Sequence, residues 1–275
     1  MVKKAENRTF EAVIFDMDGV IFDTEHLAMS LWIQAADELG ISGITEIYPS
    51  VIGTTAVRTH EILAEHYGAS FPREKFDRRV RELYHEYYDR EGLPVKPGVP
   101  ELLSSLTANH VPLALASSTY SDLVRQELRD AGFLDYFDVV IGGDMVTHSK
   151  PHPEIFLMAA KALNAAPENC YVIEDSFNGI RAAAAAGAHP LMVPDMLQPT
   201  EEIRSLAERV FPSLHEVLFF LLESGPIPAC SLASIRDLRI ENPNELLFRG
   251  RVSGADIPAL GRKRTAYRFR LICLL

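Results

Sequence analysis

The amino-acid sequence predicts an α/β protein whose core is a doubly wound, Rossmann-like parallel sheet interrupted by a helical insert. From residue 111 onward, short apolar runs alternate with amphipathic helical patterns, as in a parallel sheet that is covered by helices on both faces. Between the first apolar run, at residues 12–15, and residue 111 the patterns are helical only. These helices are therefore expected to form an insert within the sheet domain.

The elements of the core follow from these runs in chain order. The run at 12–15 (AVIF) predicts the first strand, because a short continuous apolar stretch suits a strand buried on both faces. A linker at 92–98 (GLPVKPG) returns the chain to the core and precedes a helix over 99–109. Beyond it we expect strand 111–116, helix 120–131, strand 138–142, helix 153–163, strand 170–174, helix 177–186 and strand 189–193.

The insert is predicted to hold helices over 24–40, 55–67 and 72–90. The last of them carries a group of tyrosines that we expect to pack between helices (Tyr84, Tyr87 and Tyr88). The chain is thus expected to have three parts. They are a core of residues 1–24 plus 97–223, a helical insert of residues 25–96 with hinges near 24–27 and 92–98, and a C-terminal appendage of unknown role at 224–275.

Charge and composition limit the possible binding partners and the possible cellular location. The formal net charge is −11, which argues against nucleic acid and against an anionic membrane surface as partners. Residues 225–275 differ, with nine basic and four acidic residues, a net of +5 that leaves −16 for the rest. Three features of the sequence predict a cytoplasmic protein. The three cysteines are widely spaced, the N-terminal segment is charged, and no apolar run approaches the roughly 20 residues that span a membrane.

Four predicted strand ends carry polar residues, and the first is the most informative. Residues 16–23 (DMDGVIFD) follow the first apolar run directly, which places Asp16 and Asp18 at the tip of a buried strand. Two carboxylates this close repel each other in a partly dry cleft, so a divalent cation or an anionic substrate is expected to share the site. An Asp-rich turn after an edge strand would look similar in sequence. The residues at the later strand ends therefore decide whether this is a functional site or only a turn.

The second and third strand ends supply hydroxyl, N–H and ammonium groups. Ser117 and Ser118 end an apolar strand and can donate to an oxyanion, although a serine before a helix is commonly only a cap. Lys150 precedes Pro151 and Pro153, which fix the backbone around it. Most lysines are solvated at the surface, but this fixed backbone favours a lysine held over a cleft.

The fourth strand end carries two adjacent acids, Glu174 and Asp175. Carboxylates at a strand end are hard oxygen ligands of the kind that Mg²⁺ accepts, with the remaining positions left for water and phosphate oxygens. Acids before a helix also interact favourably with its dipole. That interpretation would explain this strand end alone, but it does not explain the other three.

The polar residues at the four successive strand ends are, in order, Asp-x-Asp, Ser, Lys and Glu-Asp. This series resembles the four motifs of the haloacid dehalogenase superfamily. Residues 16–24 (DMDGVIFDT) are similar to its first motif almost letter for letter, and the resemblance runs from about residue 9 to about residue 223. The insert resembles the cap domain of the β-phosphoglucomutase-like branch. The resemblance therefore implies a doubly wound core with an inserted α-helical cap domain that closes over the substrate.

The resemblance also implies the reaction, a Mg²⁺-dependent hydrolysis of a phosphate monoester. Asp16 would attack phosphorus and become an aspartyl-phosphate. Asp18 would protonate the leaving alcohol and then deprotonate the water that clears the intermediate. The first carboxylate, the backbone carbonyl of Asp18, and Asp175 would bind Mg²⁺, with Glu174 as a ligand or an outer partner.

By the same resemblance, Ser117, the backbone of Ser118, and Lys150 would hold the phosphoryl oxygens that are not transferred. Dehalogenases of the superfamily lack an acid at the second position, so Asp18 favours phosphoryl transfer. A non-catalytic binding protein would be expected to lose one of the acids, and all of them are present here.

The remaining alternative is a sugar-phosphate mutase of the β-phosphoglucomutase type. Mutases of this branch carry a histidine where this chain has Ala28, and an arginine in a cap loop that here reads 53–56 (GTTA). His26 and Arg58 lie two residues away from these positions. We therefore expect a phosphatase rather than a mutase.

A capped site predicts a small phosphorylated metabolite, such as a sugar phosphate, a polyol phosphate or a nucleotide. The cap face would set specificity. Its candidates are residues 53–55 and side chains around Trp32, His60 and Arg58, although Trp32 and His60 are expected to be core or surface residues rather than contacts.

Overall fold

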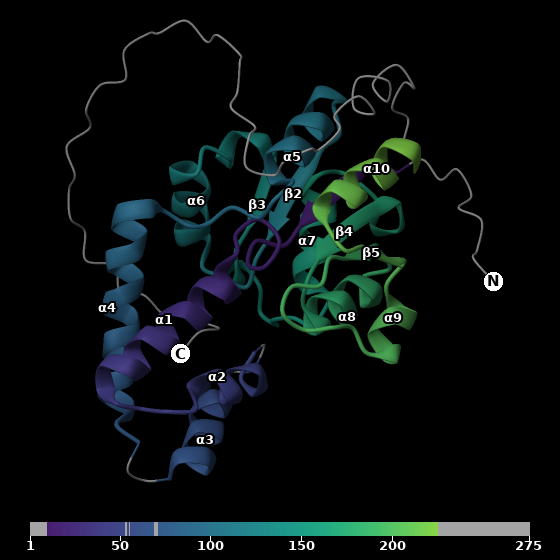
Figure 1. Ribbon diagram of the computed structural model, residues 1–275. Coiled ribbons are helices and arrows are strands. Elements are labelled where there is room, and N and C mark those ends of the chain that lie inside the picture. The colour runs from purple at the N-terminus through teal and green to yellow at the C-terminus, as the bar shows by residue number, and fades with distance from the viewer. Residues whose placement is uncertain (1–9, 53, 55, 69–70, 225–275) are drawn as a thin grey trace, which may run out of the picture. The chain divides into compact units, whose positions relative to one another are not determined.

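The computed structural model describes residues 10–52, 54, 56–68 and 71–224. Within them the sheet is parallel throughout and has the strand order β3-β2-β1-β4-β5-β6 (Figure 1). The strands are β1 (Ala12–Phe15), β2 (Leu113–Ala116), β3 (Val139–Ile141), β4 (Cys170–Glu174), β5 (His189–Met192) and β6 (Arg209–Val210). The predicted α/β fold with a parallel sheet is confirmed.

The first strand of the sequence lies at the centre of the sheet. Val13 is in register with Leu113 of β2 on one side and with Tyr171 of β4 on the other. The N–H of Asp16 donates to the carbonyl of Ile173 at 3.0 Å, which extends the pairing to the strand tip. The carboxyl ends of β1, β2 and β4 therefore meet at one edge of the sheet.

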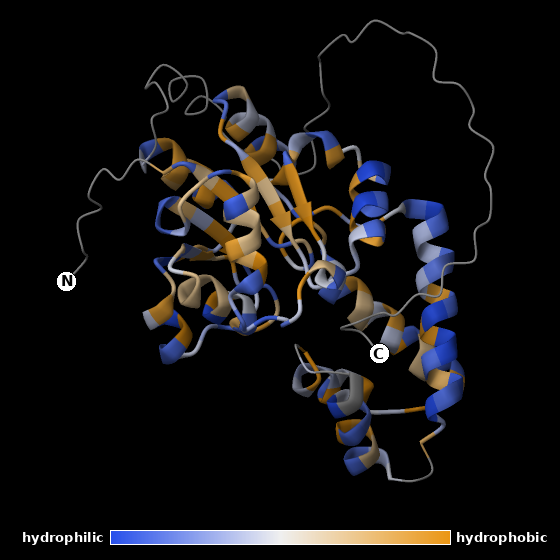
Figure 2. Cartoon of the chain, turned by 180° about the vertical axis from the view of Figure 1, so that it is seen from behind, coloured by the Kyte–Doolittle hydropathy of each residue, from blue (hydrophilic) through white to orange (hydrophobic). Residues whose placement is uncertain are grey.

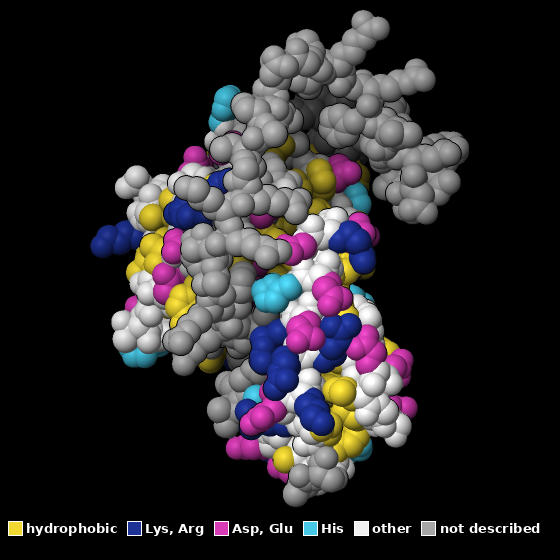
Figure 3. All heavy atoms as spheres, turned by 90° about the vertical axis from the view of Figure 1, so that its left-hand side faces the viewer, with side chains coloured by type: hydrophobic (Ala, Val, Ile, Leu, Met, Phe, Trp, Pro, Cys, Tyr) yellow, Lys and Arg dark blue, Asp and Glu magenta, His cyan; other side chains and the backbone are white. Residues whose placement is uncertain are grey.

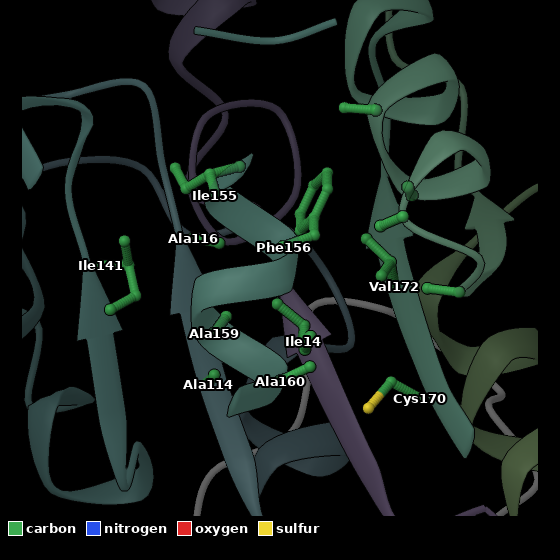
Figure 4. Packing of buried hydrophobic residues seen from close by; sticks show 14 of the residues in the cluster. Ile14, Ala114, Ala116, Ile141, Ile155, Phe156, Ala159, Ala160, Cys170 and Val172 are labelled. Atoms are coloured by element: carbon green, nitrogen blue, oxygen red, sulfur yellow. The ribbon is translucent and has the colours of Figure 1, made fainter. Parts of the chain in front are cut away.

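Both faces of the sheet are covered, because successive side chains of a strand point to opposite faces. On one face, α7 (Glu154–Ala162) and α8 (Phe177–Ala185) pack on Ile14, Ala114 and their neighbours, and the small residues Ala159 and Ala160 let α7 approach closely (Figure 4). On the other face, Tyr171 meets a phenylalanine ring of α10 (Leu214–Ser224) edge to face at 5.5 Å. Figure 2 shows the strands as a hydrophobic layer between these helices.

The predicted boundaries agree with the structure to within one or two residues. The strand expected at 111–116 begins two residues later, because Pro112 has no N–H and the N–H of Val111 donates to Leu106, 3.0 Å away. The other helices of the core are α5 (Val99–Ala108), α6 (Ser121–Asp130) and α9 (Glu201–Leu206). Its short 3₁₀ turns are η2 (Leu134–Tyr136), η3 (Gly143–Met145) and η4 (Pro167–Asn169).

The helices of the insert share a hydrophobic cluster whose buried members all lie between Leu27 and Tyr84. Trp32 is at its centre, with its ring 5.2 Å from both Tyr48 and Phe76 in edge-to-face contacts. Trp32 was expected in the core or at the surface, and the structure places it in the core. The helices of the insert are α1 (Thr24–Leu39), α2 (Ile44–Ile47), η1 (Tyr48–Ser50), α3 (Ala56–Tyr67) and α4 (Arg73–Glu91).

The outer surface of the insert is strongly charged. Figure 3 shows basic and acidic side chains intermingled over its helices, and α4 is largely hydrophilic in Figure 2. Arg79 of α4 joins this surface together, since it donates to Glu38 of α1 at 3.2 Å and to Glu86 of its own helix at 3.0 Å. Among the described residues, no helix is long and apolar enough to cross a membrane. Apart from Ser224, the appendage expected at 224–275 lies outside the described residues.

Candidate active site

The carboxyl ends of the three central strands bring together residues that are far apart in sequence (Figure 1). The Lys150 ammonium lies 2.6 Å from Asp16 Oδ1 and 2.7 Å from Glu174 Oε1, and it also donates to the Ala116 carbonyl at 3.1 Å. All three charged side chains are almost fully buried, with exposures of 7%, 10% and 0%. Residues predicted from the first, third and fourth motifs are therefore in direct contact.

Lys150 reaches this position from the loop before α7. Its ammonium lies 4.8 Å above the centre of the Phe156 ring, on the first turn of that helix. Burial alone would lower the pKa of Lys150, but the negative charges of Asp16 and Glu174 outweigh it and raise the pKa above its ordinary value. The side chain is thus a permanent cation at the tip of the central strand.

The acids around this lysine outnumber it, and their pKa values reflect the excess. Burial, with Glu174 and Asp18 adding to it, raises the pKa of Asp16 to about 7 even though Lys150 opposes the shift. Burial, and then Glu174 and Asp16, raise the pKa of Asp175 well above its ordinary value. The cluster has too little positive charge, which favours an additional cation at this point.

The donor set suits such a cation. Asp16, Glu174 and Asp175 each offer one carboxylate oxygen, and these oxygens lie within 4.8 Å of one another. A side chain at Gly19 would collide with the Asp175 carboxylate, so the glycine keeps this approach open. Hard carboxylate oxygens are typical ligands of a divalent cation such as Mg²⁺ or Ca²⁺.

Glu174 is held more firmly than its neighbour. Its Oε2 accepts from the backbone N–H and from the hydroxyl of Ser176, at 2.8 and 2.9 Å, while its other oxygen accepts from Lys150. A side chain at Gly179 would clash with the Glu174 carboxylate, which explains a glycine in the first turn of α8. Both oxygens of Glu174 are therefore already engaged, which fits an outer partner at least as well as a direct ligand.

The second acid of the first motif points toward β2. Asp18 Oδ2 accepts a hydrogen bond from Thr119 Oγ1 at 3.1 Å. Burial raises the pKa of Asp18, and the Thr119 hydroxyl partly opposes this rise. A raised pKa lets a carboxyl keep its proton to a higher pH, which suits a general acid. Thr119 was not among the predicted site residues, although it continues the hydroxyl run of Ser117 and Ser118.

The two predicted serines lie at this same edge. Ser117 is fully buried, its N–H donates to the Ile141 carbonyl at 3.1 Å, and its hydroxyl accepts from the Thr119 N–H at 3.0 Å. Ser118 follows at the end of β2 and is half-buried. The structure thus places donors from β2 beside the acids at the tips of β1 and β4.

Glu25 is a further acid near the site; it is half-buried and was not among the predicted site residues. It lies in the first turn of α1 and accepts a hydrogen bond from the Tyr48 hydroxyl at 3.4 Å. Burial, and then the charges of Asp18 and Asp195, raise its pKa to about 7. In the sequence Glu25 is an ordinary acid at a helix start, and only the packing of the insert shows that it is partly withdrawn from water.

Charged residues connect the two predicted hinges. His26 Nδ1 lies 2.7 Å from Asp23 Oδ1, and Lys96 Nζ lies 2.7 Å from Asp195 Oδ1. His26 is also 3.3 Å from Asp195. Residues of both linkers therefore meet at one buried carboxylate in the loop after β5.

The residues weighed for a mutase have other surroundings. Ala28 is buried in the hydrophobic cluster of the insert. Arg58 Nη1 contacts Glu61 and Glu65 of its own helix at 2.9 and 3.0 Å. His60 lies 3.3 Å from Asp77 within the insert. Residues 53 and 55 of the predicted specificity loop lie outside the described residues.

Comparisons with known proteins agree with this architecture. A family model described as haloacid dehalogenase-like hydrolase matches residues 10–187, more than half of the chain. The phosphorylated carbohydrates phosphatase of Thermotoga maritima is 37% identical over 177 residues, which span 64% of this chain and 82% of the relative.

Solved structures give the same family. A HAD family hydrolase from Deinococcus radiodurans R1, crystallised with phosphate and sodium, has a TM-score of 0.69 and 30% identity and covers 80% of this chain and 98% of its own. The β-phosphoglucomutase of Clostridium difficile has a TM-score of 0.58 and 29% identity and covers 78% and 97%. The chain belongs to the haloacid dehalogenase-like hydrolase family, and its activity is that of a phosphatase.

Proposed function

We propose that this phosphatase hydrolyses a small phosphorylated metabolite in a Mg²⁺-dependent reaction that passes through an aspartyl-phosphate on Asp16. The observation that carries the proposal is the contact of Lys150 with Asp16 at the tip of the central strand, 2.6 Å apart. A buried carboxylate that is aligned by a fixed cation is a suitable nucleophile toward phosphorus. The cytoplasmic location expected from the sequence is part of this proposal.

In the first step, an Asp16 oxygen forms a bond to phosphorus while the bond from phosphorus to the substrate oxygen breaks. The departing alkoxide takes the proton of Asp18, whose raised pKa lets it carry one. Lys150 and donors of Ser117 and Ser118 hold the three oxygens that remain on phosphorus. Their positive charge and N–H or O–H groups stabilise the charge spread over these oxygens.

In the second step, the Asp18 carboxylate accepts a proton from water as the water oxygen bonds to phosphorus. The bond from phosphorus to Asp16 breaks, and inorganic phosphate leaves. The hydrogen bond from Thr119 keeps Asp18 turned toward the end of β2 through both steps. One carboxyl group thus serves as acid and then as base.

The acidic cluster is the proposed place for Mg²⁺. Asp16 and Asp175 would bind it through carboxylates and Asp18 through its backbone carbonyl, with Glu174 as a ligand or outer partner. When bound, Mg²⁺ offsets the repulsion between the Asp16 carboxylate and the phosphate dianion. Without it, the pKa of about 7 at Asp16 means that much of this group is protonated near neutral pH.

A sugar or polyol phosphate is the favoured substrate class, with a nucleotide as the next. The Thermotoga maritima relative is named for phosphorylated carbohydrates. Glu25 supports the same class, since a half-buried carboxyl that feels the charge of Asp18 can accept hydrogen bonds from sugar hydroxyls. A macromolecular phosphoester does not suit a site beneath a helical insert.

Mutase activity is the alternative, because a β-phosphoglucomutase shares the fold. A mutase must retain a bisphosphate intermediate and return its second phosphate to the enzyme. Ala28 lies in an apolar cluster, and the Arg58 guanidinium contacts two glutamates of its own helix. Neither position therefore supplies a cation that would hold the second phosphate. These two positions favour hydrolysis.

The test is to incubate the full chain with Mg²⁺ and a panel of small phosphate esters that includes β-glucose 1-phosphate. Released phosphate and isomerised sugar are measured in the same sample. Phosphate release that disappears with EDTA and in Asp16→Asn supports the proposal. Isomerisation without release would make the protein a mutase, and activity retained in Asp16→Asn would overturn the nucleophile.

A further inference from the structure

Two histidines on the loop before α7 meet a glutamate at the first residue of α7, outside the acidic cluster. His148 Nδ1 lies 2.9 Å from Glu154 Oε2, and His152 Nδ1 lies 3.8 Å from the same oxygen. The two imidazole rings are 4.5 Å apart and tilted by 35°. One ligand atom from each residue lies within 4.8 Å of those of the other two. We propose that His148, His152 and Glu154 form a binding site, here called the loop site, for a divalent transition-metal ion.

The carboxylate of this site is already positioned and charged. Glu154 accepts backbone N–H bonds from Thr147 at 2.9 Å and from His148 at 3.0 Å. These two bonds hold the carboxylate in place before a metal ion binds.

A metal ion can take the place of the proton that joins His148 to Glu154. In the metal-free arrangement, an N–H proton at Nδ1 of His148 bridges the 2.9 Å gap to Oε2. Replacing that proton by a cation leaves the two backbone hydrogen bonds to the carboxylate in place. His152 Nδ1 accepts the Glu154 N–H at 3.3 Å, so His152 joins either by giving up this weak bond or by turning its ring to present Nε2.

The donor types determine which metals fit. Imidazole nitrogen with one carboxylate suits Zn²⁺, Cu²⁺, Ni²⁺ or Co²⁺, whereas Mg²⁺ prefers oxygen ligands only. Three protein ligands leave a fourth tetrahedral position for water. Water has access, because the two histidine side chains are 63% and 50% exposed. The loop site and the acidic cluster therefore differ in the metals they select.

A second histidine–carboxylate group offers a contrast within the same chain. One ligand atom from each of His26, Asp23 and Asp195 also lies within 4.8 Å of those of the other two. There, however, the Lys96 ammonium lies 2.7 Å from Asp195 and 3.4 Å from Asp23, so a cation already neutralises the group. His26→Ala also removes a histidine but should not affect metal binding by His148, His152 and Glu154 at the loop site. It is therefore a matched control.

The test is a calorimetric titration of the full chain, purified without a histidine tag, with Zn²⁺ in the presence of excess Mg²⁺ that occupies the acidic cluster. We expect one Zn²⁺ ion to bind, and affinity to fall by at least about tenfold in His148→Ala and in His152→Ala. His26→Ala and Asp175→Asn should retain the binding. Both loop histidines are exposed, so thermal unfolding should show that their variants are folded.

Electron paramagnetic resonance with Cu²⁺ supplies a second measurement that does not depend on activity. Hyperfine coupling to two imidazole nitrogens is expected in the unmodified chain and to one in each single variant. Absence of Zn²⁺ binding to the unmodified chain would overturn the proposal. So would an unchanged titration in the double variant His148→Ala/His152→Ala. Neither result depends on phosphatase activity.

Discussion

The ammonium of Lys150 lies 2.6 Å from Oδ1 of Asp16, although the two residues are 134 positions apart in the chain. This pair joins the loop before α7 to the tip of β1, and Glu174 shares the same ammonium at 2.7 Å. The site therefore depends on the fold for its charge balance. Stability and chemistry are linked at this one lysine.

Lys150→Met should remove both stability and activity. The methionine fills a similar volume but leaves two buried carboxyl groups without their cation, and breaking a buried ion pair costs about 3–5 kcal/mol. Protonation of Asp16 will relieve part of this cost. Urea unfolding should show the loss, whereas Lys161→Met, at an exposed lysine of α7, should change stability by less than about 0.5 kcal/mol. Equal stability of the two variants would contradict the account.

Glu127 gives a prediction for the pH dependence of stability. It lies on α6, accepts a hydrogen bond from Tyr84 of α4 at 3.3 Å, and its pKa is raised by burial, and then by Asp18, from 4.5 to about 8. Between these two values the folded protein keeps a proton that the unfolded chain has lost. The free energy of unfolding must therefore fall as pH rises through this window.

Glu127→Gln removes this contribution while keeping the shape of the side chain. Relative to the unmodified protein, the variant should gain on the order of 3 kcal/mol between about pH 5 and pH 8. Urea unfolding at several pH values measures the slope. Glu101→Gln, at an exposed position of α5, is the control and should leave the slope unchanged. If the free energy of unfolding has the same pH dependence in the unmodified chain and in Glu127→Gln, then Glu127 does not stay protonated in the folded protein.

Much of the fold could be predicted because its central strands are buried on both faces. Ala12, Ile14, Ala114 and Val172 are fully buried, and such strands appear in the sequence as continuous apolar runs. The edge strand β6 could not be found this way, since it has two residues and Arg209 is exposed. The apolar run at 217–222 belongs to α10, which packs on the sheet.

The site was predictable where its residues follow strands and not where they depend on packing between distant helices. Asp16 and Ser117 directly follow a strand and Glu174 ends one, so the topology alone brings them together. Glu25 and Glu127 look like ordinary helix acids in the sequence. Their burial arises only after the helices pack together, which no local pattern indicates.

Trp32→Ala should destabilise the insert. The ring is 2% exposed and packs edge to face on Tyr48 and Phe76, so truncation should cost about 3–5 kcal/mol. Thermal unfolding or native-state hydrogen exchange in α1 and α4 would measure the loss. Phe219→Ala, whose ring is 40% exposed on α10, should cost much less. An equal loss in both variants would contradict the placement of Trp32 in the core of the insert.

Glu25→Gln should weaken the use of sugar phosphates more than that of p-nitrophenyl phosphate. The amide retains the size of the side chain but loses a charged acceptor for substrate hydroxyls, worth about tenfold in kcat/KM. p-Nitrophenyl phosphate has no hydroxyl groups to bind and serves as the internal control. An equal effect on both substrates would mean that Glu25 acts on the chemistry through Asp18, and not on substrate selection.

The central claim is that Asp16 carries the phosphoryl group and Asp18 moves the protons. p-Nitrophenyl phosphate separates these roles, because its weakly basic leaving group departs without a proton donor, while the second step still needs a base. The most direct measurement is therefore the early release of p-nitrophenolate by Asp18→Asn under rapid mixing. We predict a burst of about one equivalent per active site, followed by slow turnover, and none with Asp16→Asn. A steady release without a burst in Asp18→Asn, together with turnover by Asp16→Asn, would contradict the account.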